Sequence, residues 1–332
     1  MKLPLKHRMW MLLAGVLASL GSQAEAQAEV ATPHTVVHAS VPCQQTTCDA
    51  ELWLPVQAAG APKPPVIVMA HGFGATMDWG LQPFADRFVQ AGFAVLRFDY
   101  RGFGKSGGRP RQVVDGKAHV QDWLAVIDAV RQRSDVDGTR LGIWGSSYSG
   151  GQVLVAGAER PGVVKAVSAQ VPFVNGLSSA LQYPLKYQPL AAWYALRDLM
   201  RGADETPIYI PIIAQGHFAA LVCDECVNGY GELVPAHAGP DANRVAARVL
   251  LTLPFFNPGD RAKDIQAPTL IIAAEHDGLI PVAKVREVAH SLPHGDYVEL
   301  KGADHFSPYT GPVFEQVVAR QTAFFRQHLM GQ

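Results

Sequence analysis

The fold is decided by Gly142-Ile143-Trp144-Gly145-Ser146-Ser147-Tyr148-Ser149-Gly150-Gly151, where an apolar run passes into a run of small residues. The apolar run predicts a strand buried on both faces, and the small residues predict a helix directly after it. A serine on the sharp turn between them needs small neighbours two positions away, because strand and helix come close together there. Gly145 and Ser149 are such neighbours for Ser147, whereas the rival serines Ser146 and Ser149 have no glycine two positions before them. We therefore expect the Ser147 hydroxyl to be presented at the end of the strand.

Strand and helix signals alternate on both sides of this turn. The expected strands are 66–70, 94–99, 140–144, 164–168, 269–274 and 297–300, and the expected helices are 80–91, 116–133, 148–158, 281–291 and 311–329. Residues 34–54 alternate apolar and polar side chains, which predicts antiparallel strands. The pattern is typical of an α/β fold with a mostly parallel twisted sheet of about eight strands and helices on both faces.

The alternation breaks between residues 172 and 262, a stretch rich in Pro, Gly, Tyr and Trp. We expect a mainly helical cap there, inserted into a core made of residues 29–171 and 263–332. The chain of 332 residues has a globular composition, with 48% apolar and 17% charged residues. Its formal net charge is -1 and it carries no basic stripe, so nucleic acid is not an expected partner.

Residues 1–28 predict a secretory signal peptide. Lys2, Lys6 and Arg8 precede the apolar run 9–20, and small residues with Ala-x-Ala spacing follow at 24–28. The run is short for a membrane span, although an uncleaved anchor is the alternative reading. We expect a periplasmic or secreted protein with no stable membrane insertion after cleavage.

The four cysteines fall into two local pairs, Cys43 with Cys48 and Cys223 with Cys226. Export makes disulfides possible, and four cysteines allow three connectivities, of which local pairing is the simplest. The Cys223-x-x-Cys226 pair has two other readings, a redox pair or half of a metal site. Nothing around it predicts a thioredoxin-like unit, and His217 alone is a poor further ligand for zinc. We therefore expect disulfides and no metal site.

Four stretches together resemble the α/β-hydrolase superfamily. Gly145-Ser146-Ser147-Tyr148-Ser149 resembles its nucleophile elbow, Gly-x-Ser-x-Gly, with Ser149 in place of the second glycine. His71-Gly72-Phe73-Gly74 resembles its oxyanion loop. The resemblance implies that the backbone N–H groups of Phe73 and Tyr148 form the oxyanion hole, and it leaves His71 a structural role.

The other two stretches supply the acid and the base that the resemblance implies. Asp277 follows a buried strand, where this superfamily carries its triad acid, and Glu275 is the competitor. His305 follows the last strand and resembles the catalytic base, while its neighbour Asp304 is expected to be structural. The order Ser147, Asp277, His305 is the order of the superfamily.

A glycine-rich loop at 99–107 offers a misleading match. Gly102-x-Gly104-x-x-Gly107 fits a dinucleotide fingerprint, but no helix opens directly after it, and Asp99 stands where a phosphate loop needs glycine. The loop instead resembles the Asp-x-Arg-Gly-x-Gly-x-Ser loop of α/β-hydrolases. No cofactor is therefore expected.

The resemblance implies a serine hydrolase that cleaves carboxylic esters of small molecules through an acyl-enzyme. An apolar substrate pocket is expected from the aromatic residues of the cap, which are Phe173, Tyr183, Tyr187, Trp193, Tyr194 and Phe218. The first alternative is a peptidase or amidase similar to the Xaa-Pro acyl peptidases, with an amine site built from Asp198, Asp204, Glu205, Asp224 or Glu225. His71-Gly72-Phe73 departs from that branch, which has a tyrosine beside the oxyanion. The second alternative is a non-catalytic binding protein, and the sequence leaves the oligomeric state open.

Overall fold

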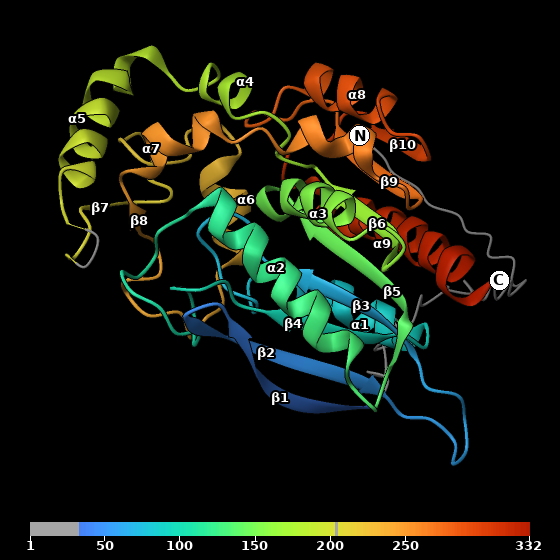
Figure 1. Ribbon diagram of the computed structural model, residues 1–332. Helices are drawn as coiled ribbons and strands as arrows, with labels where there is room; N and C mark the ends of the chain where they lie inside the picture. The colour runs from blue at the N-terminus through green and yellow to red at the C-terminus, as the bar shows by residue number, and fades with distance from the viewer. Residues whose placement is uncertain (1–32, 203–204) are drawn as a thin grey trace, which may run out of the picture. The chain divides into compact units, whose positions relative to one another are not determined.

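The computed structural model describes residues 33–202 and 205–332, so the predicted signal peptide and Asp204 lie outside the described residues. Within this part of the chain the main sheet has eight strands in the order β1-β2-β4-β3-β5-β6-β9-β10 (Figure 1). The strands are β1 (His34–Cys43), β2 (Thr46–Pro55), β3 (Pro65–Ala70), β4 (Ala94–Phe98), β5 (Asp137–Ser146), β6 (Val164–Gln170), β9 (Thr269–Ala274) and β10 (Gly295–Leu300). Strand β2 runs antiparallel to both its neighbours, and the remaining pairs are parallel. The predicted mostly parallel sheet is confirmed.

Helices on both faces explain why the central strands are continuous apolar runs. Every residue of β3, β4 and β9 is buried, as expected for strands covered on both sides. Helices α2 (Gly116–Arg131) and α3 (Tyr148–Glu159) contact each other in front of the sheet in Figure 1, and α1 (Gln82–Gln90) and α9 (Gly311–Phe325) contact each other behind it. Helix α8 (Val282–His290) connects β9 to β10.

The chain between β6 and β9 forms a separate set of short elements. Its helices are α4 (Gly176–Ala180), α5 (Gln188–Leu199), α6 (Cys226–Leu233) and α7 (Val249–Thr252). A two-stranded sheet, β7 (Tyr209–Ile210) with β8 (Val245–Ala246), was not expected, because two-residue strands leave no alternation in the sequence. The insertion lies over the end of the sheet toward which the arrows of β3 and β5 point (Figure 1). Its division from the core at residues 172 and 262 stays a prediction.

A buried ion pair holds the insertion together. Asp198, at the end of α5, is fully buried and accepts hydrogen bonds from the Arg248 side chain at 2.7 Å and from the Ile208 amide at 2.7 Å. Burial alone would raise the pKa of Asp198, but the hydrogen bonds from Arg248 and from the Ile208 amide together lower that pKa. The ionised carboxylate therefore ties α5 to the segments that precede β7 and α7.

Both local cysteine pairs form disulfides. Cys43–Cys48 joins the paired ends of β1 and β2, with Cα atoms 5.8 Å apart, and Cys223–Cys226 closes the turn that begins α6, with Cα atoms 5.1 Å apart. Of the three possible connectivities, local pairing is confirmed. Among the described helices, each is too short or too polar to cross a lipid bilayer.

Candidate active site

Ser147 occupies the turn between β5 and α3. Its backbone has φ 56° and ψ -118°, which a residue with a Cβ adopts only where the surroundings hold it. Gly145 is required beside it, because a Cβ at that position would collide with the carbonyl group of Ser149. Gly150 is equally restricted, since its Cβ would lie 2.8 Å from the Cα of Pro172. The small residues quoted at the outset thus let β5, α3 and the segment after β6 approach one another.

His305 and Asp277 lie in line with this serine. The His305 Nε2 atom is 2.9 Å from the Ser147 Oγ atom, and its Nδ1 atom is 2.7 Å from an Asp277 carboxylate oxygen. The other Asp277 oxygen accepts the amide N–H groups of Leu279 and Ile280 at 2.9 and 2.8 Å. Because the Asp277 carboxylate only accepts, Nδ1 carries the proton, so Nε2 is free to accept the Ser147 hydroxyl proton.

The competing residues have other partners. Glu275 accepts hydrogen bonds from Lys301 and from the Gly302 amide, and Asp304 accepts those of Phe306 and Ser307. The Ser146 hydroxyl lies 2.6 Å from that of Tyr309. The Ser149 hydroxyl contacts the Tyr100 hydroxyl and donates to the His71 carbonyl. The serine that replaces the second glycine therefore links the turn at Ser147 to the loop at His71.

The loop at residues 71–74 passes close to Ser147. A Cβ placed on Gly72 would lie 3.7 Å from the Ser147 Cβ atom. The Tyr100 amide donates to His71 Nε2 at 3.4 Å, so Nδ1 carries the ring proton and donates to the Gly72 carbonyl at 3.0 Å. Burial lowers the pKa of His71 to about 4, which keeps the ring neutral. His71 is thus placed in a structural role.

That contact of His71 also orients an amide donor. The Gly72–Phe73 peptide is planar and trans, so the Phe73 N–H points away from the carbonyl that His71 holds. No partner for this N–H is present among residues 33–202 and 205–332. The Tyr148 N–H opens α3, where the first amides of a helix lack partners within the helix. Phe73, Tyr148 and Ser147 line one pocket.

Sequence reasoning missed Tyr230. Its hydroxyl, from α6 of the insertion, donates to the Phe73 carbonyl at 2.7 Å, and the side chain is buried. The insertion therefore takes part in holding the loop at residues 71–74. No pattern singles out Tyr230 among the nine tyrosines of the chain, because the insertion shows no regular alternation of strand and helix signals.

A pocket of about 410 Å³ opens beside Ser147. Its walls are mostly apolar and come largely from the insertion and the loop after β9; they include Ala180, Leu181, Tyr183, Ala191, Leu221, Val222, Leu250, Leu253, Leu279 and Ile280. Of the aromatic residues expected here, Phe173 and Tyr183 line the pocket, whereas Tyr194 stacks on Phe218 and Trp193 is 58% exposed. The described lining residues include no carboxylate.

A second, much smaller pocket of about 40 Å³ lies on the His305 side of the serine. Ser147 and Phe73 border both pockets, whereas His305 and Tyr230 border only the small one. The surroundings of Ser147 are therefore strongly asymmetric in volume.

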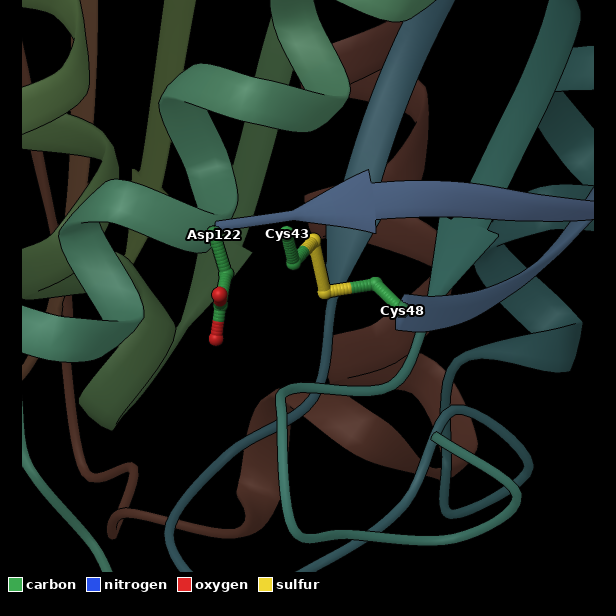
Figure 2. A group of neighbouring side chains, drawn as sticks. All are labelled: Cys43, Cys48 and Asp122. Atoms are coloured by element: carbon green, nitrogen blue, oxygen red, sulfur yellow. A yellow bond between two sulfur atoms is a disulfide. The ribbon is translucent and has the colours of Figure 1, made fainter. Parts of the chain in front are cut away.

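One cluster of potential metal ligands lies away from this site. Cys43, Cys48 and Asp122 place one ligand atom each within 4.8 Å of one another (Figure 2). Figure 2 shows the two sulfur atoms joined to each other, and a disulfide offers no thiolate. Asp122 is engaged by Arg101, whose Nε and Nη2 atoms lie 2.8 and 2.5 Å from the same carboxylate oxygen. The donor set does not fit a metal ion.

The loop at 99–107 is held by its own hydrogen bonds. Asp99 accepts the amides of Met77 and Lys105, and the Ser106 hydroxyl donates to the Asp99 carbonyl at 2.7 Å. Burial raises the pKa of Asp99 to about 7. The loop supports the neighbouring segment at Met77 and is separate from the lining of the large pocket.

Comparison with known proteins adds independent evidence. A family model described as the alpha/beta hydrolase fold matches residues 65–312. The quorum-quenching protein AidA of Acinetobacter baumannii is 38% identical over 288 residues, which cover 84% of this chain and 91% of the relative. A monoacylglycerol lipase of Mycolicibacterium smegmatis is 30% identical over 239 residues, 71% of this chain and 78% of the relative. The crystal structure of the alpha/beta hydrolase GrgF from Penicillium sp. superposes with a TM-score of 0.73 at 21% identity, over 90% of this chain and 99% of that one.

Proposed function

The chain belongs to the α/β-hydrolase family and is a hydrolase, and from that premise we propose that it cleaves carboxylic ester bonds with Ser147 as nucleophile, His305 as base and Asp277 as acid. The observation that carries this proposal is the continuous chain of contacts from Ser147 Oγ through His305 to Asp277. The order of the three residues along the chain agrees with it.

The proposed reaction has two stages. His305 Nε2 takes the Ser147 proton as Oγ attacks the ester carbonyl, and Asp277 stabilises the imidazolium that results. The Phe73 and Tyr148 amides donate to the oxyanion of the tetrahedral intermediate. His305 then passes its proton to the departing alcohol oxygen, which leaves an acyl group on Ser147. A water molecule, deprotonated by His305, attacks that acyl group; the bond between the acyl carbon and Ser147 Oγ then breaks, His305 returns the proton to Oγ, and the carboxylic acid leaves.

The two unequal pockets suggest which part of the ester lies where. The departing alcohol receives its proton from His305, so it belongs in the small pocket that His305 borders. The acyl chain then occupies the large apolar pocket. We therefore propose esters of an apolar acid and a small alcohol. A monoacylglycerol is such an ester, and the relative named for that substrate supports the proposal.

The alternatives receive less support. An aminopeptidase needs a carboxylate for the substrate amine, but Asp198 is paired with Arg248 and Glu225 accepts the Gly278 amide. The binding-protein alternative predicts a broken triad, whereas His305 lies within hydrogen-bond reach of both Ser147 and Asp277.

Hydrolysis of p-nitrophenyl acetate, butyrate and octanoate by the protein, beside Ser147→Ala, tests the proposal. We expect turnover by the wild type and a loss of several orders of magnitude in kcat for the variant, with its circular dichroism spectrum unchanged. If the two proteins hydrolyse all three esters at the same slow rate, the proposed ester hydrolysis through Ser147 is wrong. Hydrolysis of matched amide substrates would then decide for the peptidase alternative.

We also propose that the protein is exported. The two disulfides are suited to an oxidising compartment, and the sequence of residues 1–28 has the layout of a signal peptide. Mass spectrometry of the protein from the periplasm and the medium should give a mature N-terminus near residue 29. A mass that includes residues 1–28 would contradict cleavage.

A further inference from the structure

Exposed apolar side chains gather on one part of the insertion. Outside the insertion, Val36 and Val56 are the only large apolar side chains of the described residues that are exposed to a comparable degree. Within it, Leu177, Leu181 and Leu185 are 59%, 75% and 80% exposed, and further examples follow on α5. An apolar patch of this kind on an otherwise globular chain marks a contact surface. We call residues 177–201 the α4–α5 surface.

Helix α5 has its apolar stripe on the outside. Leu190, Trp193, Leu196 and Met200 recur at helical spacing and are all exposed, with Met200 at 86%. The opposite face carries the buried Ala191, Ala195 and Asp198. A surface helix normally buries its large apolar side chains, whereas α5 exposes them and buries two alanines and Asp198. Figure 1 shows α5 on the outside of the insertion, away from the sheet.

The same surface is positively charged. Lys186, Arg197 and Arg201 are exposed, and among the described residues none of them forms an ion pair with a carboxylate. Arg197 lies over the Trp193 ring, 5.4 Å from its centroid. Of the described carboxylates nearby, Asp198 is buried against Arg248, and Glu205 is exposed just after the helix, so the three cations outnumber the one exposed carboxylate. Apolar side chains flanked by cations are what an anionic lipid surface attracts.

The surface is continuous with the mouth of the large pocket. Leu181 is 75% exposed and also lines that pocket. Gln188 and Ala192, on α5, line it as well. An apolar molecule leaving a lipid layer that covers α4 and α5 would therefore meet the pocket entrance without crossing water.

From these observations we propose that the α4–α5 surface adsorbs to lipid layers that carry anionic headgroups, with the large pocket opening toward the lipid. A second copy of the chain fits less well, because a symmetric pair would gather the cations Lys186, Arg197 and Arg201 of both copies in one interface. The proposal does not depend on which bond Ser147 attacks.

Vesicle flotation tests the proposal directly. The protein, purified from the exported fraction of expressing cells, is mixed with vesicles of phosphatidylcholine alone or of phosphatidylcholine with phosphatidylglycerol. The apolar variant carries Leu190→Gln, Trp193→Gln and Leu196→Gln, and the charge variant carries Lys186→Gln, Arg197→Gln and Arg201→Gln. The matched control, Val36→Gln with Val56→Gln, removes exposed apolar side chains elsewhere. Hydrolysis of p-nitrophenyl acetate and the circular dichroism spectrum of each variant report whether the chain is folded.

We expect the wild type and the control to float with the anionic vesicles. The apolar variant should bind them at least tenfold more weakly, about 1.4 kcal/mol, and the charge variant should lose the preference for anionic over zwitterionic vesicles. Equal flotation of the apolar variant and the wild type would overturn the proposal, as would a wild type that stays unbound. A wild type that elutes as a dimer, becomes a monomer in the apolar variant and ignores vesicles would assign the surface to a second copy.

Discussion

At the scale of single residues, the two carboxylate oxygens of Asp277 have different hydrogen-bond partners. One accepts two backbone amides and the other faces His305 Nδ1. In Asp277→Asn the amide oxygen can keep the backbone contacts, but the NH₂ group then faces His305 and favours the wrong tautomer. We expect kcat to fall by about 10⁴-fold while the protein stays folded.

Glu275→Gln is the matched control for Asp277→Asn. Glu275 precedes Asp277 by two residues and is turned toward Lys301 and Gly302. Its kcat for p-nitrophenyl butyrate should remain within about twofold of the wild type, since it makes no contact with His305. If the two variants lose activity equally, Asp277 is not the specific partner of His305.

Tyr230 offers a second test at the residue scale. Tyr230→Phe leaves the Phe73 carbonyl without its donor while it keeps the ring, so the loop that carries the Phe73 N–H should lose its fixed position. We expect kcat to fall about tenfold and KM to change less than about twofold, because the contact acts on the oxyanion and not on substrate binding.

The control for Tyr230 is Tyr209→Phe. It removes a hydroxyl that donates to the Arg111 carbonyl at 3.0 Å, outside both pockets. Both variants should show the wild-type chain-length ranking in steady-state kinetics. If Tyr230→Phe changes KM but keeps the kcat of the wild type, Tyr230 contributes only to the wall of the small pocket.

These residues also show what sequence reasoning can and cannot predict. Ser147, Asp277 and His305, the proposed triad, could be predicted to lie together because each follows a strand of the parallel part of the sheet, and parallel strands bring their carboxyl ends to one edge. Tyr230 reaches the same place from an irregular segment. Its position depends on tertiary packing that no local pattern records.

At the scale of elements, the β5–α3 turn depends on the absence of a side chain at Gly145. In Gly145→Ala the added Cβ would collide with the Ser149 carbonyl, and backbone cannot move aside as a flexible side chain does. We expect a loss of about 3 kcal/mol in the free energy of unfolding and a Tm lower by about 6 °C or more, measured by thermal unfolding.

Gly231→Ala is the control at this scale. Gly231 lies in helix α6, and a Cβ there would meet no atom within 4 Å. Alanine should raise the free energy of unfolding by about 0.5–1 kcal/mol. If Gly145→Ala and Gly231→Ala have the same Tm, the turn tolerates a Cβ at Gly145.

The regular elements of the core agree with the sequence pattern to within a few residues. Strand β5 begins at Asp137, before the expected residue 140, because its first residues are only partly buried and carry no apolar signal. The elements of the insertion could not be predicted from the sequence. Most of its helices are short and its strands have two residues each, so it shows no regular alternation of strand and helix.

At the scale of the whole molecule, buried titratable groups make the stability depend on pH. Burial lowers the pKa of His71 to about 4 and that of His119 well below its usual value, so both rings are neutral in the folded chain. Below about pH 6.5 both histidines are protonated in the unfolded chain but stay neutral in the folded chain, so acid favours unfolding. Asp99 opposes them, because burial raises its pKa to about 7 and the folded chain keeps its proton.

The two histidines predict a loss of stability in acid, and the raised pKa values of Asp99 and Asp122 offset part of it. The free energy of unfolding, from urea titrations, should fall as the pH is lowered from about 6 to about 4. His119→Phe should remove most of this slope. Ile127→Val, buried in the same helix α2, changes no titratable group and should keep the slope at a lower stability. An equal slope in His119→Phe and the wild type would contradict the assignment.

The insertion leaves the sheet after β6 and returns at β9, and its two ends are hydrogen-bonded to each other, since the Gly259 amide donates to the Val174 carbonyl at 2.8 Å and the Gly176 amide to the Phe256 carbonyl at 3.1 Å. The two ends of the insertion are therefore fixed next to each other whatever lies between them. Closing a longer or shorter loop between fixed ends changes the entropy of folding only slowly with its length. Related proteins can thus evolve a longer, shorter or different segment here, and with it a different substrate pocket, while the core and the residues proposed for catalysis stay the same.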